Sequence, residues 1–213
     1  MSQLSNLIDF SVNDFLKELS SSSPAPGGGS VSALSVAIAS SLTEMVANLT
    51  LGRKKYAEVS DDMTQMKVLA AKFTVEAKQL VDLDTEAYVK VMRAFQLPKE
   101  TPDEKTTRRE AILFATRNAI EVPKRTATLA YEVMKIIEVA LAKGNSNTAS
   151  DGLVASYLAL SGCKGAIANI RINLISLKDA DEIAGYDYFC RDLLAKMEEL
   201  ALQAEILAKT HLG

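Results

Sequence analysis

The most unusual stretch of the chain is PAPGGGSVSA, in which the glycines Gly27, Gly28 and Gly29 stand directly before Ser30. Ordering three glycines costs conformational entropy, so a folded chain that keeps them usually needs positive φ angles or a close approach of the backbone. If Ser30 caps a helix, the free amides of its first turn would bind an anion or a carbonyl group. A turn that only allows close helix packing is the alternative interpretation, because a glycine run alone is a weak signal.

Three aspartates, Asp82, Asp84 and Asp151, are candidates for acid–base chemistry. Asp82 and Asp84 are two residues apart in a helical segment, so they lie on different faces. Asp151 follows Ser150 in the asparagine-rich loop GNSNTASD, just before a helix. Such a carboxylate is either a general acid or base, or the N-cap of the helix. For the helical pair, the alternative is a solvated surface side chain.

Amide side chains form a second polar group in otherwise apolar surroundings. Asn169 and Asn173 are four residues apart and share a helix face, where they would hydrogen-bond a ligand or each other. Asn147 belongs to the loop before Asp151. Arg171 lies on another face of the Asn169 helix and would bind a carboxylate or a partner subunit. A buried structural network is the alternative role for the three amides.

Cations cluster in the segment GRKKY, at Arg53, Lys54 and Lys55. These side chains would bind an anionic ligand, or they would stabilise the C-terminal end of a helix by interacting favourably with its dipole. The surface role is at least as good an explanation for each of them.

Composition narrows the class of protein. The chain has 213 residues, of which 48% are hydrophobic and 24% charged, as in an ordinary globular protein. A net charge of -3 gives no electrostatic footprint for nucleic acid or an anionic membrane. The N-terminus lacks the basic start and long apolar stretch of a secretory signal, and no run of 18 uncharged apolar residues predicts a membrane span. We therefore expect a cytoplasmic protein without nucleic-acid or membrane partners.

The cysteines and the histidine argue against several kinds of chemistry. Cys163 and Cys190 are far apart without a CxxC motif, which favours buried, reduced thiols over a zinc site. The single histidine, His211, is near the C-terminus, where a solvated position in the last helical turn is the better interpretation. No glutamate has a histidine three residues later, as a di-iron bundle would require. We expect no metal site.

Apolar residues recur at helical spacing almost everywhere, and the sequence predicts one all-α domain. No segment alternates as a strand does, and no linker divides the chain. The predicted helices run from Ser11 to Leu19, Ser30 to Leu51, Asp61 to Ala94, Pro102 or Thr106 onward, Pro123 to about Gly144, Leu153 to Leu177, and Asp181 to Lys209. A single kinked helix through Pro123 is equally acceptable. The expected fold, over residues 1–213, is a single-domain multi-helix bundle of long, mostly antiparallel helices.

Six blocks of sequence resemble the formiminotetrahydrofolate cyclodeaminase and methenyltetrahydrofolate cyclohydrolase family. In chain order they are PAPGGGSVSA, MVANLTLGRKKY, LVDLDTEAY, AIEVP, GNSNTASD and NIRINL. Together they cover nearly the whole chain and are far more specific than any one of them. In that family the domain stands alone in many bacteria and forms the C-terminal half of formiminotransferase-cyclodeaminase in animals. The 213 residues contain no formiminotransferase half, so we expect no such activity.

The resemblance implies an enzyme of folate one-carbon metabolism. Cyclodeamination converts 5-formimino-tetrahydrofolate to 5,10-methenyl-tetrahydrofolate and ammonia, and the alternative, cyclohydrolysis, converts the methenyl compound to 10-formyl-tetrahydrofolate. Both need an acid or base, and a carboxylate near the delocalised cation stabilises it. Both proceed without a cofactor beyond the folate substrate. A non-catalytic helical scaffold remains a further interpretation, because fold does not fix function.

The resemblance also implies site residues. It favours Asp151 and Asp84 as catalytic carboxylates, with Asp84 preferred over Asp82. The implied folate-binding residues are Gly27, Gly28, Gly29, Ser30, Lys54, Lys55, Tyr88, Asn147, Asn169 and Asn173. We further expect a homodimer that buries part of the two most apolar helices, Ser30 to Leu51 and Leu153 to Leu177, with the folate site near the interface.

Overall fold

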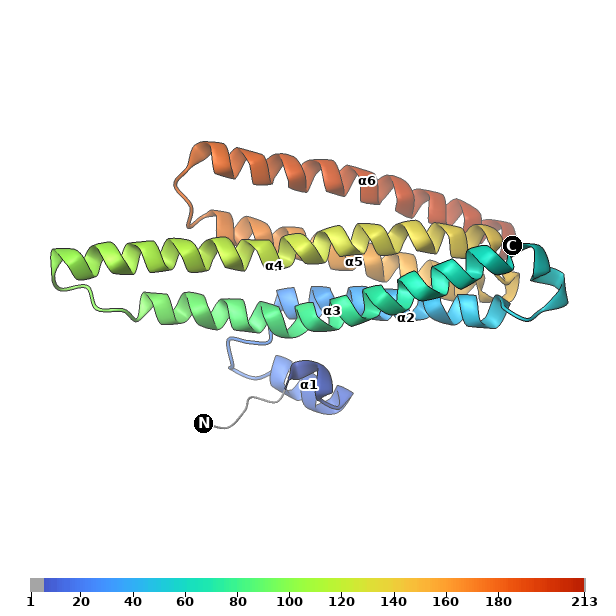
Figure 1. Ribbon diagram of the computed structural model, residues 1–213, viewed down its shortest axis with the longest axis horizontal. Helices are drawn as coiled ribbons and strands as arrows, with labels where there is room; N and C mark the ends of the chain where they lie inside the picture. The colour runs from blue at the N-terminus through green and yellow to red at the C-terminus, as the bar shows by residue number, and fades with distance from the viewer. Residues whose placement is uncertain (1–5, 213) are drawn as a thin grey trace.

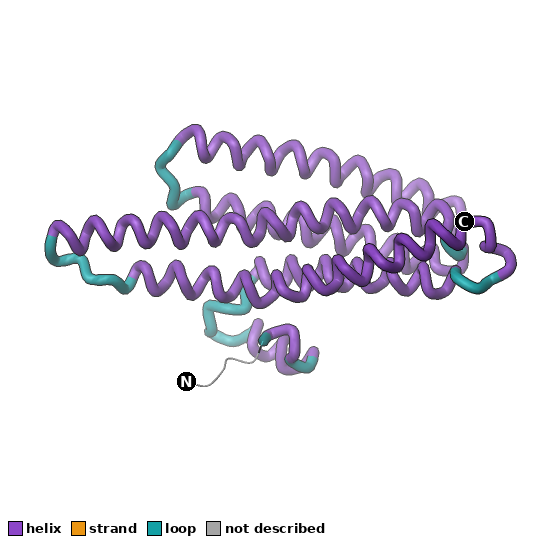
Figure 2. The backbone as a smooth tube through the Cα atoms, in the orientation of Figure 1, coloured by secondary structure: helices purple, strands orange, loops and turns teal. Residues whose placement is uncertain are grey.

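The computed structural model describes residues 6–212, and every regular element in that range is helical (Figures 1 and 2). The elements are η1 (Leu7–Asp9), α1 (Val12–Leu19), α2 (Gly28–Thr50), η2 (Lys54–Val59), α3 (Ser60–Phe95), α4 (Pro102–Lys143), η3 (Ser146–Thr148), α5 (Ala149–Leu174) and α6 (Ala180–Leu212), where η marks a 3-10 helix. The predicted all-α fold class is confirmed.

Helices α2, α3, α4 and α5 form a four-helix core. Consecutive helices run antiparallel, and α2 closes the core by packing against α5 as well as α3 (Figure 1). The sixth helix, α6, packs on α5 and α4, while η1 contacts α3. In Figure 1, α1 lies below the core beside the start of α2. Each core helix therefore has a neighbour on two sides.

Side-chain caps begin three of the helices. Ser11 accepts a hydrogen bond from the Asp14 amide at 3.1 Å and so caps α1, as predicted. Thr101 and Glu104 form a reciprocal capping box at the start of α4. Asp179 Oδ1 accepts hydrogen bonds from two amides in the first turn of α6, each at 3.0 Å. These caps satisfy amides that have no partner within their own helix.

The structure corrects two predicted helix starts. The N-cap of α2 is Gly27, so Ser30 lies inside the first turn and is not the predicted cap. The N-cap of α5 is Thr148, so Asp151 lies within the first turn of that helix rather than in the loop before it. Both helices therefore begin earlier in the sequence than predicted, α2 at Gly28 and α5 at Ala149.

The chain passes through Pro123 without a break. Helix α4 contains Pro123 in its interior, so of the two alternatives the single continuous helix is the one observed. Proline removes the hydrogen bond that residue 123 would donate to the Ala119 carbonyl, four residues earlier. A partner from another helix satisfies that carbonyl, as described below.

Small residues bring α2 and α5 close together. A Cβ atom added to Gly162 would lie 2.7 Å from Val36 Cγ2 and 2.9 Å from the Ser32 carbonyl oxygen. A Cβ atom on Gly165 would overlap the Ser32 hydroxyl. Because real Cβ atoms do not approach other atoms so closely, these two glycines set the separation of the helices.

By length and composition alone, Gly28–Thr50 and Ser146–Leu174 are each apolar enough to cross a membrane. The sequence predicted no membrane span, because 18 apolar residues without a charge were required. These two segments each contain at least one charged residue, so they did not meet that requirement. Both segments belong to the four-helix core, and 56% and 44% of their apolar windows are buried within the bundle. Helix packing therefore accounts for much of their apolar character.

Candidate functional site

The first turn of α2 lies between α3 and α5. Gly29 is buried, and a Cβ atom at this position would overlap the carboxylate of Asp84 on α3. At Gly28, an added Cβ atom would lie 3.4 Å from Asn169 Nδ2 on α5. Gly27 has extended backbone angles, with φ −130° and ψ −160°. Gly29 is thus the glycine that a close approach of the chain's own side chain requires, and none of the three has a positive φ.

Asp84, one of the two predicted catalytic carboxylates, is half-buried on α3. Its Oδ2 atom lies 3.1 Å from the Ser30 hydroxyl, which is also 2.9 Å from the Val81 carbonyl oxygen. Burial raises the pKa of Asp84, and hydrogen bonds from the hydroxyl and the amide of Ser30 act in the opposite direction without cancelling the effect. This carboxyl therefore keeps its proton to a higher pH than an exposed aspartate.

Asn173 provides the partner that the Ala119 carbonyl lacks because of Pro123. Asn173 Nδ2 donates to the Ala119 oxygen at 3.3 Å and to the Asn169 carbonyl oxygen at 2.9 Å. Asn169 Nδ2 in turn donates to the Gly165 carbonyl oxygen at 2.9 Å. Both protons of the Asn173 amide are thus directed at carbonyls, which leaves its side-chain oxygen as the group that can accept from a ligand.

We call Gly27, Gly28, Gly29, Ser30, Asp84, Asn169 and Asn173 the glycine-turn cluster. Tyr88 follows Asp84 by one helical turn on α3 and is half-buried. Asp82 instead accepts a hydrogen bond from the Leu7 amide at 2.6 Å and so holds the N-terminal segment. The two neighbouring carboxylates have different partners, in agreement with their predicted placement on different helix faces.

The remaining predicted residues lie at the other end of the core, around Tyr56. Lys54 and Lys55 are exposed on η2, and Asn147 is exposed on η3. Asp151 is half-buried in the first turn of α5. Along α5, Asp151 and Asn169 are separated by about five helical turns, or about 27 Å. A single protomer therefore divides the predicted site residues between two places.

Sequence reasoning did not single out Tyr56 and Asn145. The Tyr56 hydroxyl accepts a hydrogen bond from the Ser146 amide at 3.1 Å, and it lies 3.3 Å from the Ser146 hydroxyl. Asn145 is 5% exposed, and its backbone amide donates a hydrogen bond to the Thr50 hydroxyl at 2.9 Å. We call Thr50, Tyr56, Asn145 and Ser146 the Tyr56 cluster. Tyr56 and Asn145 both stand in blocks that carry the family resemblance, which was the available signal.

The thiols and the histidine lie where the sequence predicted. Cys163 and Cys190 are buried and unbonded. Burial raises the pKa of the Cys163 thiol to about 12 and also raises that of Cys190, so neither is a ready nucleophile. His211 is exposed in the last turn of α6. Among residues 6–212, no group of three or more potential metal-binding side chains is found.

Fold and sequence together identify the family. The profile described as formiminotransferase-cyclodeaminase matches residues 11–188. The crystal structure of formiminotetrahydrofolate cyclodeaminase from Thermotoga maritima has a TM-score of 0.85 and 25% sequence identity, over 95% of this chain and 97% of that chain. This protein is thus a helical bundle of the cyclodeaminase type. The chain belongs to the formiminotransferase-cyclodeaminase family, as the resemblance implied.

Two relatives show how the chain compares in length. The methenyltetrahydrofolate cyclohydrolase of Methylorubrum extorquens is 35% identical over 196 residues, which are 92% of this chain and 91% of that protein. The formimidoyltransferase-cyclodeaminase of Mus musculus is 32% identical over 174 residues, which are 82% of this chain but 32% of the mouse protein. The chain therefore matches the bacterial relative over nearly its full length and the mouse relative over about a third.

The contact between Asn173 and Ala119 gives a stability prediction. We expect Asn173→Ala to lower the free energy of unfolding by about 1–3 kcal/mol, because it leaves the Ala119 carbonyl without a donor. In a Pro123→Ala background the loss should be smaller, since residue 123 then donates within α4. Chemical denaturation of the single and double variants measures this coupling. Asn118→Ala, an exposed amide on α4, is the control and should change little. Equal losses in both backgrounds would contradict the pairing.

Proposed function

We propose that this chain cyclodeaminates 5-formimino-tetrahydrofolate, giving 5,10-methenyl-tetrahydrofolate and ammonia. The observation that carries the proposal is the half-buried carboxyl of Asp84, which lies against the first turn of α2 and has a pKa raised by desolvation. Membership of the family supports a folate substrate. A carboxyl of this kind suits a reaction in which a proton must reach a poor leaving group.

The proposed chemistry uses Asp84 twice. N10 of the folate attacks the formimidoyl carbon, the N10 proton passes to the formimidoyl nitrogen, and the bond from the carbon to the resulting amino group then breaks. The protonated Asp84 carboxyl donates to the departing nitrogen, which leaves as ammonia. The resulting aspartate lies beside the delocalised methenyl cation and stabilises it. Ser30, within 3.1 Å of Asp84, orients the carboxyl through its hydroxyl.

A second candidate is cyclohydrolysis of 5,10-methenyl-tetrahydrofolate to 10-formyl-tetrahydrofolate. It is favoured by the cyclohydrolase relative that matches 91% of its own length at 35% identity. In that reaction water adds to the methenyl carbon, the bond to N5 breaks, and a proton is released. Cyclodeamination takes up a proton at the leaving group, whereas cyclohydrolysis requires a base for water, so the two reactions need Asp84 in opposite protonation states.

We assign the predicted folate contacts by cluster. The glycine-turn cluster and Tyr88 would receive the pterin, since free amide oxygens and exposed Gly28 lie together there. Lys54, Lys55 and Asn147 would receive the folate glutamates, a role supported by the exposure of all three. No cofactor beyond the folate is part of the proposal, and a cytoplasmic location stays a prediction.

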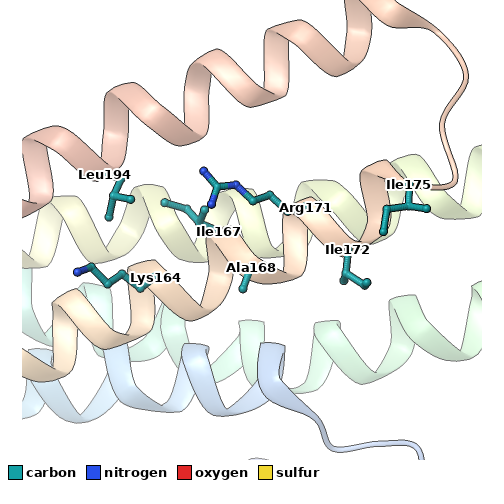
Figure 3. A pocket seen from close by; sticks show the side chains of 7 residues that line it. All are labelled: Lys164, Ile167, Ala168, Arg171, Ile172, Ile175 and Leu194. Carbon is teal, nitrogen blue, oxygen red and sulfur yellow. The ribbon is translucent and has the colours of Figure 1, made fainter.

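A homodimer would reunite the two groups of site residues. Exposed apolar side chains lie along the outside of α5 and at its C-cap, Ile175, with Tyr157 47%, Ile172 62% and Ile175 77% exposed. Ile172 and Ile175 line a groove of about 520 Å³ along α5, with Leu194 of α6 at its edge (Figure 3). A two-fold axis perpendicular to α5 would lay two copies of this helix antiparallel. The Asp151 end of one protomer would then lie near the Asn169 end of its partner.

The reaction is tested by supplying each substrate separately. Incubation with 5-formimino-tetrahydrofolate should raise the methenyl absorbance and release ammonia in equal amounts. Incubation with 5,10-methenyl-tetrahydrofolate should leave its absorbance close to the uncatalysed rate of decay. Catalysed loss of methenyl absorbance without ammonia release would favour the cyclohydrolase. Turnover of neither substrate, together with no binding of 5-formyl-tetrahydrofolate at high micromolar concentration, would favour a scaffold.

Two carboxylate substitutions test the assigned roles. We expect Asp84→Asn to lower turnover by about a hundredfold or more, the usual scale for losing a positioned acid or base. We expect Asp151→Asn, at the second of the two predicted catalytic carboxylates, to lower turnover by a similar factor. Asp82→Asn is the matched control, because its carboxylate holds the N-terminal segment. Unchanged turnover and unchanged melting in Asp151→Asn would assign that residue to the helix terminus alone.

The raised pKa of Asp84 adds a stability readout. A folded-state pKa above the unfolded value means that the stabilising contribution is present at low pH and is lost as pH rises through the folded pKa. As pH rises through the folded-state pKa of Asp84, the wild type should lose stability and Asp84→Asn should not. The melting temperature of Asp84→Asn should therefore rise relative to that of the wild type across this pH range. A constant difference between the two proteins at all pH values would contradict the raised pKa.

Light scattering tests the dimer. We expect twice the 23.0 kDa mass of one chain at micromolar concentration. Ile172→Glu should shift the protein toward the monomer and lower turnover, because a charge in an apolar interface is costly to desolvate. Val68→Glu, at a side chain that is 64% exposed on α3, is the matched control and should leave the mass unchanged. A monomer at micromolar concentration in the wild type would rule out the dimer.

A further inference from the structure

Tyr56 connects two segments that are far apart in the sequence. It lies on η2, directly after Lys54 and Lys55, and is half-buried. Its hydroxyl accepts the Ser146 amide hydrogen at 3.1 Å and lies 3.5 Å from Asn145 Oδ1. The contact therefore joins the cationic turn after α2 to the turn before α5.

The turn before α5 is held from a second side by the end of α2. The Asn145 amide donates to the Thr50 hydroxyl at 2.9 Å, and Asn145 Nδ2 donates to the Leu49 carbonyl oxygen at 3.2 Å. Asn145 Oδ1 accepts from the Asn147 amide at 3.1 Å. The position of Asn147, and of the helix that begins two residues later, thus depends on contacts with both α2 and η2.

We propose that Tyr56 is a positioning residue of the folate site, whose hydroxyl holds the segment carrying Asn147 and Asp151 in register with Lys54 and Lys55. Without that hydroxyl, Ser146 would lose the acceptor of its amide, and the segment would be anchored only through Asn145. The role in turnover rests on the proposed function, whereas the hydrogen bond to Ser146 can be measured without any substrate.

The surroundings of Tyr56 make this contact sensitive to pH. The pKa of Tyr56 is lowered to about 8, first by the Ser146 hydroxyl, then by the Ser146 amide, with a smaller effect from Lys55. The Lys55 ammonium lies 5.1 Å from the centre of the Tyr56 ring and is the charged group that acts on it. From the facing turn, the neighbours are the uncharged Asn145 and Ser146. Ionisation strengthens the bonds that the oxygen accepts, because charge-assisted hydrogen bonds are stronger.

The test compares Tyr56→Phe with wild type. The variant keeps the aromatic ring under Lys55 and removes only the hydroxyl. We expect kcat to fall by about tenfold to a hundredfold, the usual scale for a small misplacement of site residues, with a smaller change in KM. In nitrogen-labelled protein, the Ser146 amide should exchange with solvent faster. A wild-type step in the pH profile of kcat near pH 8 should be absent from the variant.

Two controls separate positioning from general loosening. Tyr188→Phe removes a tyrosine hydroxyl at a side chain that is 68% exposed on α6 and should leave kcat, Ser146 exchange and the pH profile unchanged. Thr50→Val loosens the same turn from the α2 side. It should speed exchange at Asn145 but retain the step near pH 8, because Tyr56 is intact.

Each outcome bears on one proposal. Unchanged Ser146 exchange in Tyr56→Phe would overturn the hydrogen bond itself, and faster exchange with unchanged kcat would overturn the positioning role. Absence of turnover in the wild type would overturn the proposed function, and Ser146 exchange would still decide the contact. If Tyr56→Phe does not fold, the wild type gives the result: phenolate absorbance and the protection of the Ser146 amide, taken relative to the intrinsic exchange rate at each pH, must then change over the same pH range.

Discussion

The first turn of α2 is fixed between α3 and α5 because it has almost no side-chain volume. Asp84 approaches from α3 and occupies the space that a Cβ atom at Gly29 would need. Asn169 lies beside Gly28 from α5, where an added Cβ atom would be 3.4 Å from its Nδ2 atom. A larger residue at Gly29 would displace the Asp84 carboxyl from its place against this turn. The separation of the core helices and the ionisation of Asp84 therefore depend on the same few atoms.

The periodic part of the fold could be predicted from sequence, and the exceptions have physical causes. Apolar spacing identified every long helix, and Ser11 and Pro102 marked two of the starts. The consequence of Pro123 was ambiguous because it depends on Asn173, a partner on the neighbouring helix α5 that is far away in the sequence. Ser30 was mistaken for a cap, since its hydroxyl binds the Val81 carbonyl of α3 instead of an amide of its own helix. Local sequence does not report such long-range partners.

The candidate site was harder to predict than the fold. Residue type and resemblance drew attention to Asp84 and Asn169, which the structure brings to the same turn of α2. The same reasoning grouped them with Asp151, although about five turns of α5 separate it from Asn169. Spacing in a sequence says nothing about distance across a bundle when the elements are this long. Tyr56 was overlooked because its partner is a backbone amide, which has no side-chain signature.

The number of residues in α5 sets the distance between the glycine-turn cluster and the Tyr56 cluster. Each residue of a helix adds about 1.5 Å and about 100° of rotation. A one-residue insertion between Gly152 and Gly162 would turn Asn169 away from the α2 turn, and it would also move Gly162 and Gly165 off the line along which α2 and α5 touch. The connection from Gln96 to Thr101 has no such double role, because both α3 and α4 extend beyond the shorter α2 there (Figure 1). Length variation during evolution is therefore expected in that connection, while α5 keeps its residue count.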